Sequence, residues 1–312
     1  MLRLTRRAAL QSFLTVAGIA LLASCSDSTG PSQGALFKTM YVFGASLDDT
    51  GNACNASASA CPPAPYATGR YSNGSLYVEL LATKYGATVT PSRTGGTNYA
   101  YAGARTGAIT GTNQGVPNMV QQVATFLATP NGGARGQALF VVNGATVGND
   151  INDALTQSAT NPQAPATIIG SAVANMVTMV NQLYAGGARH ILVINSTDVG
   201  RTPLVRSFGA AAAAGATAFS TQFNTAFAAQ LPTLRSSNSG LNLYLLDLGQ
   251  LTTEVTAAPA TFGFSNVTQA CVVASPPSLC ATPDTYFYWD SFHPTAAAGR
   301  LVSVRAIAAV GR

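Results

Sequence analysis

The sequence of 312 residues carries little charge, because Asp, Glu, Lys and Arg make up only 9% of it. An ordinary soluble domain has roughly 25%. Three of the 16 basic residues, Arg3, Arg6 and Arg7, lie at the extreme N-terminus, and without them 13 basic residues face 11 acidic ones, so the formal charge falls from +5 to +2. The clustered Lys and Arg that mark a nucleic-acid-binding surface are therefore missing, and we expect no nucleic acid partner.

Long apolar runs are also missing, since Phe13 to Leu22 is too short for a lasting transmembrane helix. This run follows three arginines and leads into Leu-Ala-Ser-Cys25, the order of a signal peptide that ends in a bacterial lipobox. The pattern predicts a signal peptide over residues 1–24 and lipidation of Cys25, with an ordinary cleaved signal as the alternative. We expect a protein exported to the bacterial cell envelope and held by this lipid anchor at the outer membrane or facing the periplasm.

Residues 25–35 are rich in Ser, Gly, Pro and Asp and show no apolar period, which predicts a flexible tether. No shift of composition follows this segment. We therefore expect residues 36–312 to form a single domain, and we expect the protein to be a monomer.

Cysteine is scarce, and only Cys54, Cys61, Cys271 and Cys280 remain once Cys25 is assigned to the anchor. An even number in an oxidising compartment predicts disulfides, and three pairings are possible. The favoured disulfides join Cys54 to Cys61 and Cys271 to Cys280, because each pair is close in sequence within a loop-like segment. A zinc site is disfavoured because no histidine lies at ligand spacing, and we expect no metal or cofactor.

Short apolar runs alternate with longer helical stretches, which is typical of a parallel sheet covered by helices in an α/β fold. The predicted strands are 39–43, 88–90, 138–142, 190–195 and 241–246. The predicted helices are 76–84, 116–128, 167–184, 208–231 and 295–309. Most of these strands are apolar on both faces, as burial between two helix layers requires.

Histidine is the rarest potential catalytic base, with only two residues in the chain. His190 begins a buried strand, where we expect a structural role. His293 follows Asp290 by three residues, and a tight turn of this spacing brings the carboxylate against Nδ1 of the imidazole. Alone, this segment is equally consistent with a polar helix-capping turn.

Ser46 gives His293 a partner. It follows the apolar run Met40 to Phe43 and a Gly-Ala pair, so it is expected at the carboxyl edge of the sheet, where open α/β folds bind their ligands. A serine nucleophile needs a base, and the base needs a carboxylate that orients it. The sequence therefore predicts a catalytic triad of Ser46, His293 and Asp290.

Two further segments follow predicted strands and offer donors for an oxyanion. Gly103 lies in a Gly-rich stretch after residues 88–90, and it could present its N–H without a side chain in the way. Asn149 follows the strand at 138–142, and its amide could point inward. Gly and Asn are also the default residues of ordinary turns, so each segment has a plain alternative.

Five segments in order resemble the GDSL, or SGNH, family of serine esterases and lipases over nearly the whole mature chain. They are Phe43-Gly-Ala-Ser-Leu-Asp-Asp-Thr-Gly-Asn52, Gly69-Arg-Tyr-Ser-Asn-Gly74, Asn98-Tyr-Ala-Tyr-Ala-Gly-Ala-Arg-Thr106, Gly148-Asn-Asp150 and Asp290-Ser-Phe-His-Pro294. Within that family, the sequence resembles the phospholipase-like and lecithinase-like bacterial lipoproteins. It implies a three-layer α/β/α sandwich with a five-stranded, flavodoxin-like parallel sheet. It also implies that Ser46 is the nucleophile, and that the N–H groups of Ser46 and Gly103 and the side chain of Asn149 form the oxyanion hole.

Three positions depart from the family pattern. Ala45 replaces an Asp that usually braces the nucleophile turn, Val147 replaces a Gly in a segment that is two residues longer, and Gly299 replaces a frequent histidine. None of these changes removes a catalytic atom.

The resulting hypothesis is a hydrolase that cleaves lipid or short-chain acyl esters through an acyl-enzyme on Ser46. Five aromatic residues are expected near the site, where they line an acyl or aryl pocket or belong to the core: Tyr99, Tyr101, Tyr286, Phe287 and Trp289. The alternatives are a catalytically impaired surface lipoprotein that acts as a binding module, a glycan acetylesterase, and an acyltransferase that uses the same residues.

Overall fold

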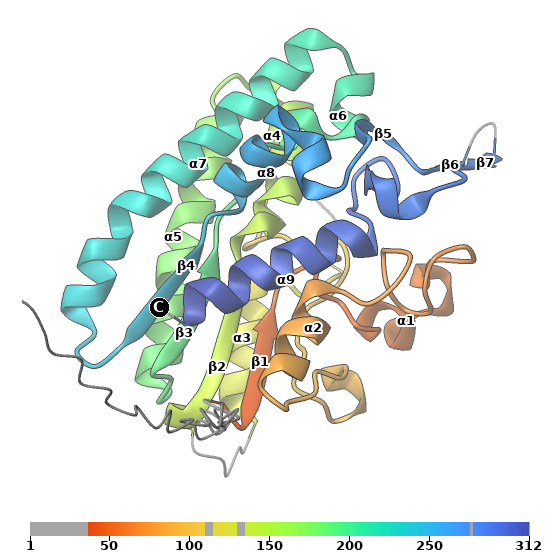
Figure 1. Cartoon of the computed structure of the whole chain (residues 1–312). Coiled ribbons are helices and arrows are strands. Elements are labelled where there is room, and N and C mark those ends of the chain that lie inside the picture. The colour runs from red at the N-terminus through yellow and green to blue at the C-terminus, as the bar shows by residue number, and fades with distance from the viewer. Residues whose placement is uncertain (1–36, 110–114, 130–134, 275–276, 312) are drawn as a thin grey trace, which may run out of the picture. The chain divides into compact units, whose positions relative to one another are not determined.

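Four parallel strands form the central sheet of the computed structural model, which describes residues 37–109, 115–129, 135–274 and 277–311 (Figure 1). The strands lie side by side in chain order and pair without a register shift. They are β1 (Thr39–Phe43), β2 (Ala138–Asn143), β3 (His190–Ile194) and β4 (Asn242–Leu246). All four carboxyl ends therefore meet at one edge. The predicted signal peptide, the tether and Cys25 lie outside the described residues.

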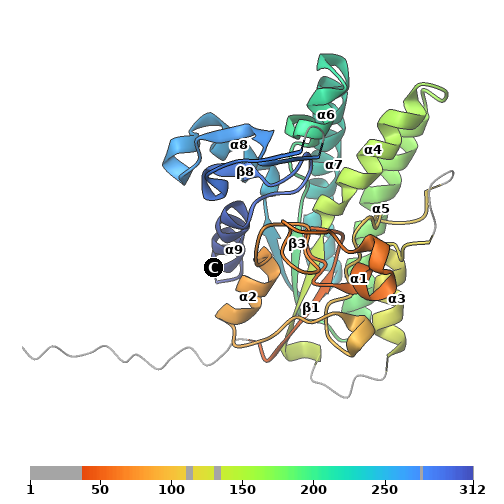
Figure 2. The ribbon, with the colours of Figure 1, turned by 90° about the vertical axis from the view of Figure 1, so that its right-hand side faces the viewer.

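Helices cover both faces of this sheet, so the fold is an α/β sandwich (Figure 2). Alternate side chains of each strand point to opposite faces: Phe140 and Val142 enter one hydrophobic core and Leu139 and Val141 the other. One layer contains α3 (Met119–Ala128), α5 (Ala164–Ala185) and α7 (Ala210–Ser237). The other contains α2 (Tyr77–Lys84), α8 (Leu248–Ala257) and α9 (Ala296–Val310). The prediction of strands buried between two helix layers is confirmed.

The expected fifth strand is wrong, because residues 88–90 run beside residues 97–98 and do not join the sheet. Asn98 instead makes a single parallel bridge to Val42 of β1. The N–H of Asn98 donates to Thr90 on its other side (2.9 Å). Ser92 in turn donates its N–H to the carbonyl of Asn98 at 2.8 Å, so Asn98 lies between β1 and residues 90–92, and the pairing with β1 is limited to this one bridge.

Several helices were missed or differ in length. The segment of Gly148 and Asn149, for which no helix was predicted, begins α4 (Val147–Ser158). Gly209, with φ of 99°, separates the short α6 (Pro203–Ser207) from α7, so the predicted helix at 208–231 begins later and ends later. The short helix α1 (Asn52–Ala56) was also not predicted.

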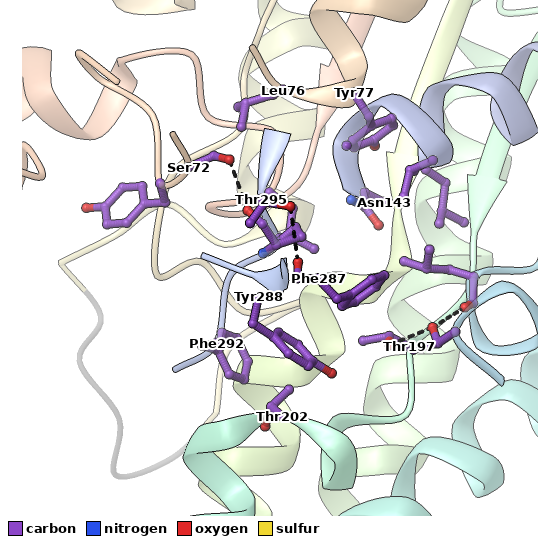
Figure 3. Close-up of a pocket in the computed structure, with 18 of the residues that line it drawn as sticks. Ser72, Leu76, Tyr77, Asn143, Thr197, Thr202, Phe287, Tyr288, Phe292 and Thr295 are labelled. Atoms are coloured by element: carbon purple, nitrogen blue, oxygen red, sulfur yellow. Dashed lines mark hydrogen bonds between the residues drawn. The ribbon is translucent and has the colours of Figure 1, made fainter. Parts of the chain in front are cut away.

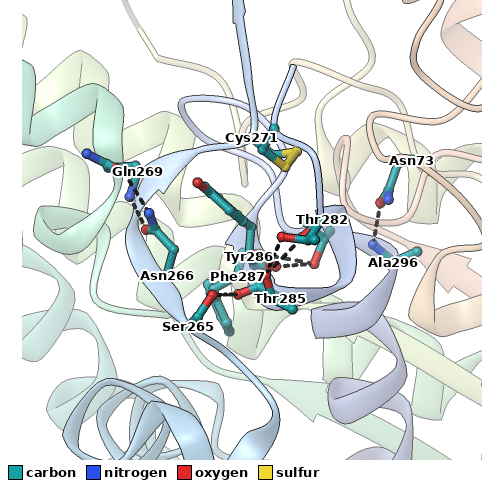
Figure 4. The surroundings of a disulfide bond; sticks show 12 residues. Asn73, Ser265, Asn266, Gln269, Cys271, Thr282, Thr285, Tyr286, Phe287 and Ala296 are labelled. Atoms are coloured by element: carbon teal, nitrogen blue, oxygen red, sulfur yellow. Dashed lines mark hydrogen bonds between the residues drawn. A yellow bond between two sulfur atoms is a disulfide. The ribbon is translucent and has the colours of Figure 1, made fainter. Parts of the chain in front are cut away.

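Four short strands outside the main sheet follow α8, and a disulfide closes the hairpin among them (Figure 4). β5 (Asn266–Ala270) pairs with β8 (Tyr286–Tyr288), and β6 (Val272–Ala274) pairs with β7 (Pro277–Leu279). Cys271 and Cys280 join the base of this hairpin, and Cys54 and Cys61 bridge α1 to the following loop. This is the pairing that closeness in sequence favoured.

Within the described part of the chain, no helix has both the length and the apolar character needed to span a bilayer.

Candidate active site

Ser46 lies in the tight turn that follows β1, at the carboxyl edge of the sheet, and is almost fully buried. The carbonyl of Ala45 accepts the N–H groups of Asp48 and Asp49, both at 3.0 Å. A side chain at Gly44 would overlap the carboxyl of Asp48. The glycine is therefore needed because the buried Asp48 packs directly against the backbone of the turn.

Gln122 of α3 braces this turn from the side. Its Oε1 accepts the N–H of Gly44 and its Nε2 donates to the carbonyl of Gly44, both at 3.0 Å. Gln122 is only 1% exposed, so water does not compete for these bonds. The turn thus has a brace although Ala45 lacks the expected carboxylate. A glutamine 78 residues away carries no sequence signal for this role.

His293 joins Ser46 to Asp290 in a continuous chain of hydrogen bonds. Its Nε2 lies 2.8 Å from Oγ of Ser46, and its Nδ1 lies 2.7 Å from Oδ2 of Asp290. The turn before α9 sets this geometry, because Oδ1 of Asp290 accepts the N–H groups of Phe292 and His293, both at 2.7 Å. The structure therefore brings together the three residues that the sequence predicted as a triad.

Tyr66, which the sequence analysis missed, donates its hydroxyl to Oδ2 of Asp290 at 2.7 Å. That oxygen is the one that faces His293. Burial acts to raise the pKa of Asp290. The hydrogen bond and the charge of the His293 side chain, together with the backbone N–H groups of His293 and Phe292, outweigh burial, so this pKa is lowered. Asp290 is thus held as a carboxylate. Tyr66 lies in a Pro-rich loop with no recognisable motif, so nothing in its local sequence indicates a contact with Asp290.

Replacing Tyr66 by phenylalanine should lower kcat roughly tenfold. The loss follows because one hydrogen bond that orients Asp290 is removed, so the carboxylate holds the imidazole of His293 less firmly in place. The measurement is kcat and KM for p-nitrophenyl butyrate, and we expect KM to stay near the wild-type value.

Tyr71→Phe is the matched control for this change. The ring of Tyr71 lies 5.2 Å from that of His293, centroid to centroid, while its hydroxyl donates to the carbonyl of Ala60, away from the triad. We expect kcat of this variant to stay within twofold of the wild type. A Tyr66→Phe enzyme with the same kcat as Tyr71→Phe would show that Tyr66 does not position Asp290.

Three potential oxyanion donors lie around the turn. Among the described residues, neither the N–H of Ser46 nor that of Gly103 has a hydrogen-bond partner. Gly103 has φ of 81°, a conformation that suits glycine, and no atom lies within 4 Å of the position of a Cβ, so the space beside it is open. Asn149 lies in the first turn of α4, and its Nδ2 donates to the carbonyl of Ala104 at 2.7 Å. One proton of this amide is thus directed at the loop of Gly103, and the second is free for another acceptor.

The loop that carries Gly103 is tied to the serine turn by buried polar side chains. The carboxylate of Asp49 accepts the N–H of Ala102 at 2.9 Å and also caps the start of α1. Asn52 donates to the carbonyls of Asn98 and Ala100 (2.7 and 2.9 Å). Asp49 and Asn52, which follow Ser46 in the sequence, therefore position the loop of Gly103 relative to the turn of Ser46. Both contacts were invisible in the sequence because their partners lie about 50 residues away.

The other two departures from the family pattern are accommodated. Val147 is fully buried in the hydrophobic core at the start of α4, and the two extra residues before it form a 3₁₀ turn that leads into this helix. Gly299 of α9 lines a cavity of about 70 Å³ whose lining includes chain neighbours of Ser46 and His293 (Figure 3). Leu47, Phe287 and Phe292 also line it. None of the triad residues faces this cavity, so it is a packing space behind the site.

The predicted aromatic residues take different places. Tyr99 and Trp289 are core residues, and Phe287 faces the cavity just described. Tyr286 lines a surface groove that also contains Asp290 and His293. Tyr101 donates its N–H to Gly44 at 3.3 Å. These five residues therefore do not form one acyl pocket.

Two buried carboxyls next to the site have raised pKa values. Burial raises the pKa of Asp48 to about 7, although hydrogen bonds from Tyr77 and Asn143 act against it. Burial likewise raises the pKa of Asp150 to about 7, against hydrogen bonds from Thr106. Both groups are therefore partly protonated near neutral pH.

These carboxyls predict that the protein is less stable at pH 8 than at pH 5.5. An unfolded Asp releases its proton near pH 4, so between about pH 4 and pH 7 the folded state binds more protons than the unfolded state. The free energy of unfolding must then fall as pH rises through this window. The lowered pKa of Asp290 acts in the opposite sense, but only below about pH 4.

We expect Tm to fall by on the order of 5 °C between pH 5.5 and pH 8, measured by circular dichroism. Asp150→Asn keeps the shape of the side chain and cannot ionise, so it should reduce this difference. An equal or higher Tm at pH 8 would contradict the prediction.

Comparison with known proteins relates most of the chain to one family. The family model described as GDSL-like Lipase/Acylhydrolase matches residues 40–305. A GDSL esterase/lipase of Arabidopsis thaliana is 25% identical over 315 residues, covering 85% of each chain. A second Arabidopsis GDSL esterase/lipase is 24% identical over 323 residues, covering 86% of this chain and 88% of the plant protein. Lipase 1 of Photorhabdus luminescens is 31% identical over 179 residues, covering 55% of this chain but only 24% of that protein. The chain, matched over most of its length and including all the residues of the site, belongs to the GDSL-like lipase/acylhydrolase family of ester hydrolases.

Proposed function

We propose that the protein is a serine hydrolase that cleaves carboxylic esters through an acyl-enzyme on Ser46. The observation that carries the proposal is the chain of short hydrogen bonds from Ser46 Oγ through His293 to Asp290, at 2.8 and 2.7 Å. The family relationship and the relatives named as esterases or lipases support the reaction class.

The chemistry follows from the position of each group. Oγ of Ser46 attacks the ester carbonyl while Nε2 of His293 takes its proton, and Asp290 stabilises the resulting imidazolium. The negative charge on the carbonyl oxygen is met by the N–H groups of Ser46 and Gly103 and by the amide of Asn149. Collapse of the intermediate expels the alcohol, which receives the proton from His293. Water then enters, loses a proton to the same imidazole, and releases the acid.

The test combines turnover of p-nitrophenyl butyrate with labelling by a fluorophosphonate probe. We expect burst kinetics and labelling at Ser46, and the loss of both in Ser46→Ala. A folded protein with neither turnover nor labelling would instead support a non-catalytic binding module. The braced turn at Ser46 and the hydrogen bonds from His293 to both Ser46 and Asp290 argue against that alternative. Adding a competing alcohol and analysing the products distinguishes hydrolysis from acyl transfer.

We also propose that the mature protein is anchored in the bacterial envelope through a lipid on Cys25. The N-terminal arginines, the short apolar run and the Leu-Ala-Ser-Cys25 sequence support this proposal. Metabolic labelling with palmitate should mark the wild-type protein and not Cys25→Ala. Labelling that survives this change would rule out Cys25 as the anchor.

A further inference from the structure

A groove of about 640 Å³ lies between α4 on one side and α6 with the first half of α7 on the other. These helices rise together beyond the carboxyl edge of the sheet, the edge that carries Ser46 (Figure 2). Most of the groove lining is aliphatic or aromatic: Leu155, Leu204, Phe208, Ala211, Ala212 and Phe219. Its size lies within the range of sites that hold small organic ligands.

The groove begins one helical turn from the predicted oxyanion donor Asn149. Asn152 and Thr156 line it, and they lie three and seven residues after Asn149, hence on the same face of α4. The turn that carries His293 lies at this end as well. The ring of Phe292 covers Gly148, where a Cβ would lie 3.1 Å from Cζ of the ring. The groove and the site therefore share helix α4, with the groove beginning one turn after Asn149.

The groove also leaves a large apolar side chain in solvent. Phe208, at the corner between α6 and α7, is 61% exposed although it lines the groove. Its floor is narrow, because Gly215 of α7 lies close to Leu155 of α4, with a Cβ position 3.5 Å from Cδ2. A thin apolar ligand fits such a groove, whereas a folded domain does not.

A second groove lies on the other side of α6 and differs in character. It measures about 1100 Å³, contains Asp290 and His293, and includes the polar residues Arg206 and Gln269. Pro203 and Arg206 of α6 face this groove, while Leu204 of the same helix faces the apolar one. An ester bound at Ser46 extends in two directions, with its acyl chain on one side and its alcohol on the other. The apolar groove matches an acyl chain, and the groove with polar residues matches an alcohol.

We propose that the apolar groove between α4 and α6–α7 binds the acyl chain of the substrate, so that medium-chain acyl esters are the preferred class. This inference rests on the proposed hydrolysis at Ser46. The α4 wall from Asn149 to Ser158 measures roughly 13 Å at 1.5 Å per residue, which accommodates about ten carbons of an extended chain. Each methylene that enters the groove should raise kcat/KM about threefold, until the groove is full.

The test measures kcat/KM for soluble p-nitrophenyl esters from acetate to decanoate in the wild type and two variants. Ala211→Trp places an indole in the groove from an exposed position of α7. Ala214→Trp is the matched control, because Ala214 is exposed on the same helix but lies outside the groove lining. We expect Ala211→Trp to lower the ratio of kcat/KM for decanoate to that for acetate at least tenfold. Ala214→Trp should leave the ratio within twofold of the wild type.

Each outcome bears on one of the two proposals. A wild-type enzyme whose kcat/KM does not rise with chain length would overturn the acyl groove while leaving the hydrolase intact. An Ala211→Trp variant in which kcat/KM for acetate and for decanoate change by the same factor would also overturn the acyl groove. Absence of turnover with every ester, together with absence of fluorophosphonate labelling, would instead overturn the proposed function itself.

Discussion

His293→Gln is expected to lower kcat for p-nitrophenyl butyrate by roughly 10⁵-fold to 10⁶-fold, the size of loss seen when a triad base is removed. Glutamine fills a similar volume but cannot take the proton from Oγ of Ser46, which His293 contacts at 2.8 Å. Asp290 keeps its two backbone N–H donors and Tyr66, so the loop should hold its shape. The fluorophosphonate reaction should slow in parallel, because it needs the same activated serine.

The chain offers one matched control for this change, since it has only one other histidine. His190 begins β3 at the opposite edge of the sheet, where its Nδ1 lies 3.0 Å from the hydroxyl of Tyr244 and its ring packs on Phe37. His190→Gln should therefore change kcat less than threefold. If both variants lost activity equally, the assignment of His293 as the base would be wrong.

The second large effect is expected at Asn149. Asn149→Ala should lower kcat by about 10²-fold to 10³-fold with little change in KM, as for the loss of one oxyanion donor. The reason is that the amide stabilises charge that exists only in the transition state. Its tie to the carbonyl of Ala104 is lost as well, so the loop that presents Gly103 should become less ordered.

Asn149→Asp keeps the size of the side chain, but it loses both functions of the amide and places a negative charge beside the carbonyl of Ala104 and the developing oxyanion. We expect a larger loss of kcat than in Asn149→Ala. If kcat of Asn149→Ala stays within threefold of the wild type, Asn149 is not an oxyanion donor.

Contacts between distant segments explain why parts of the site could not be predicted. Gln122 braces Gly44 from a helix that reads as an ordinary amphipathic helix, and Tyr66 reaches Asp290 across 224 residues of sequence. The sequence suggested that Ala45 weakens the nucleophile turn. The structure shows that an amide from another helix makes the hydrogen bonds, a compensation with no local signature.

The strand count illustrates a similar limit. Residues 88–90 have the composition of a strand, yet a strand exists only if a neighbour accepts and donates its backbone hydrogen bonds. Asn98 occupies the free edge of β1 instead, through a single bridge. Helix α4 was missed for the opposite reason: its Gly-Asn-Asp start has the composition of a loop, and contacts with distant segments stabilise the helix, among them the burial of Val147 and Ile151 in the core.

The sequence by itself determined the α/β class, four of the strands and the identity of the three residues that meet at the site. These follow from short-range patterns: apolar runs of strand length, a serine directly after one of them, and Asp290 three residues before the only histidine near a helix start. Tertiary structure alone decided the braces of Gln122 and Tyr66, the first-turn position of Asn149 on α4, and the two grooves that flank α6. Each of these depends on how separate helices pack, and no residue pattern within one segment records that packing.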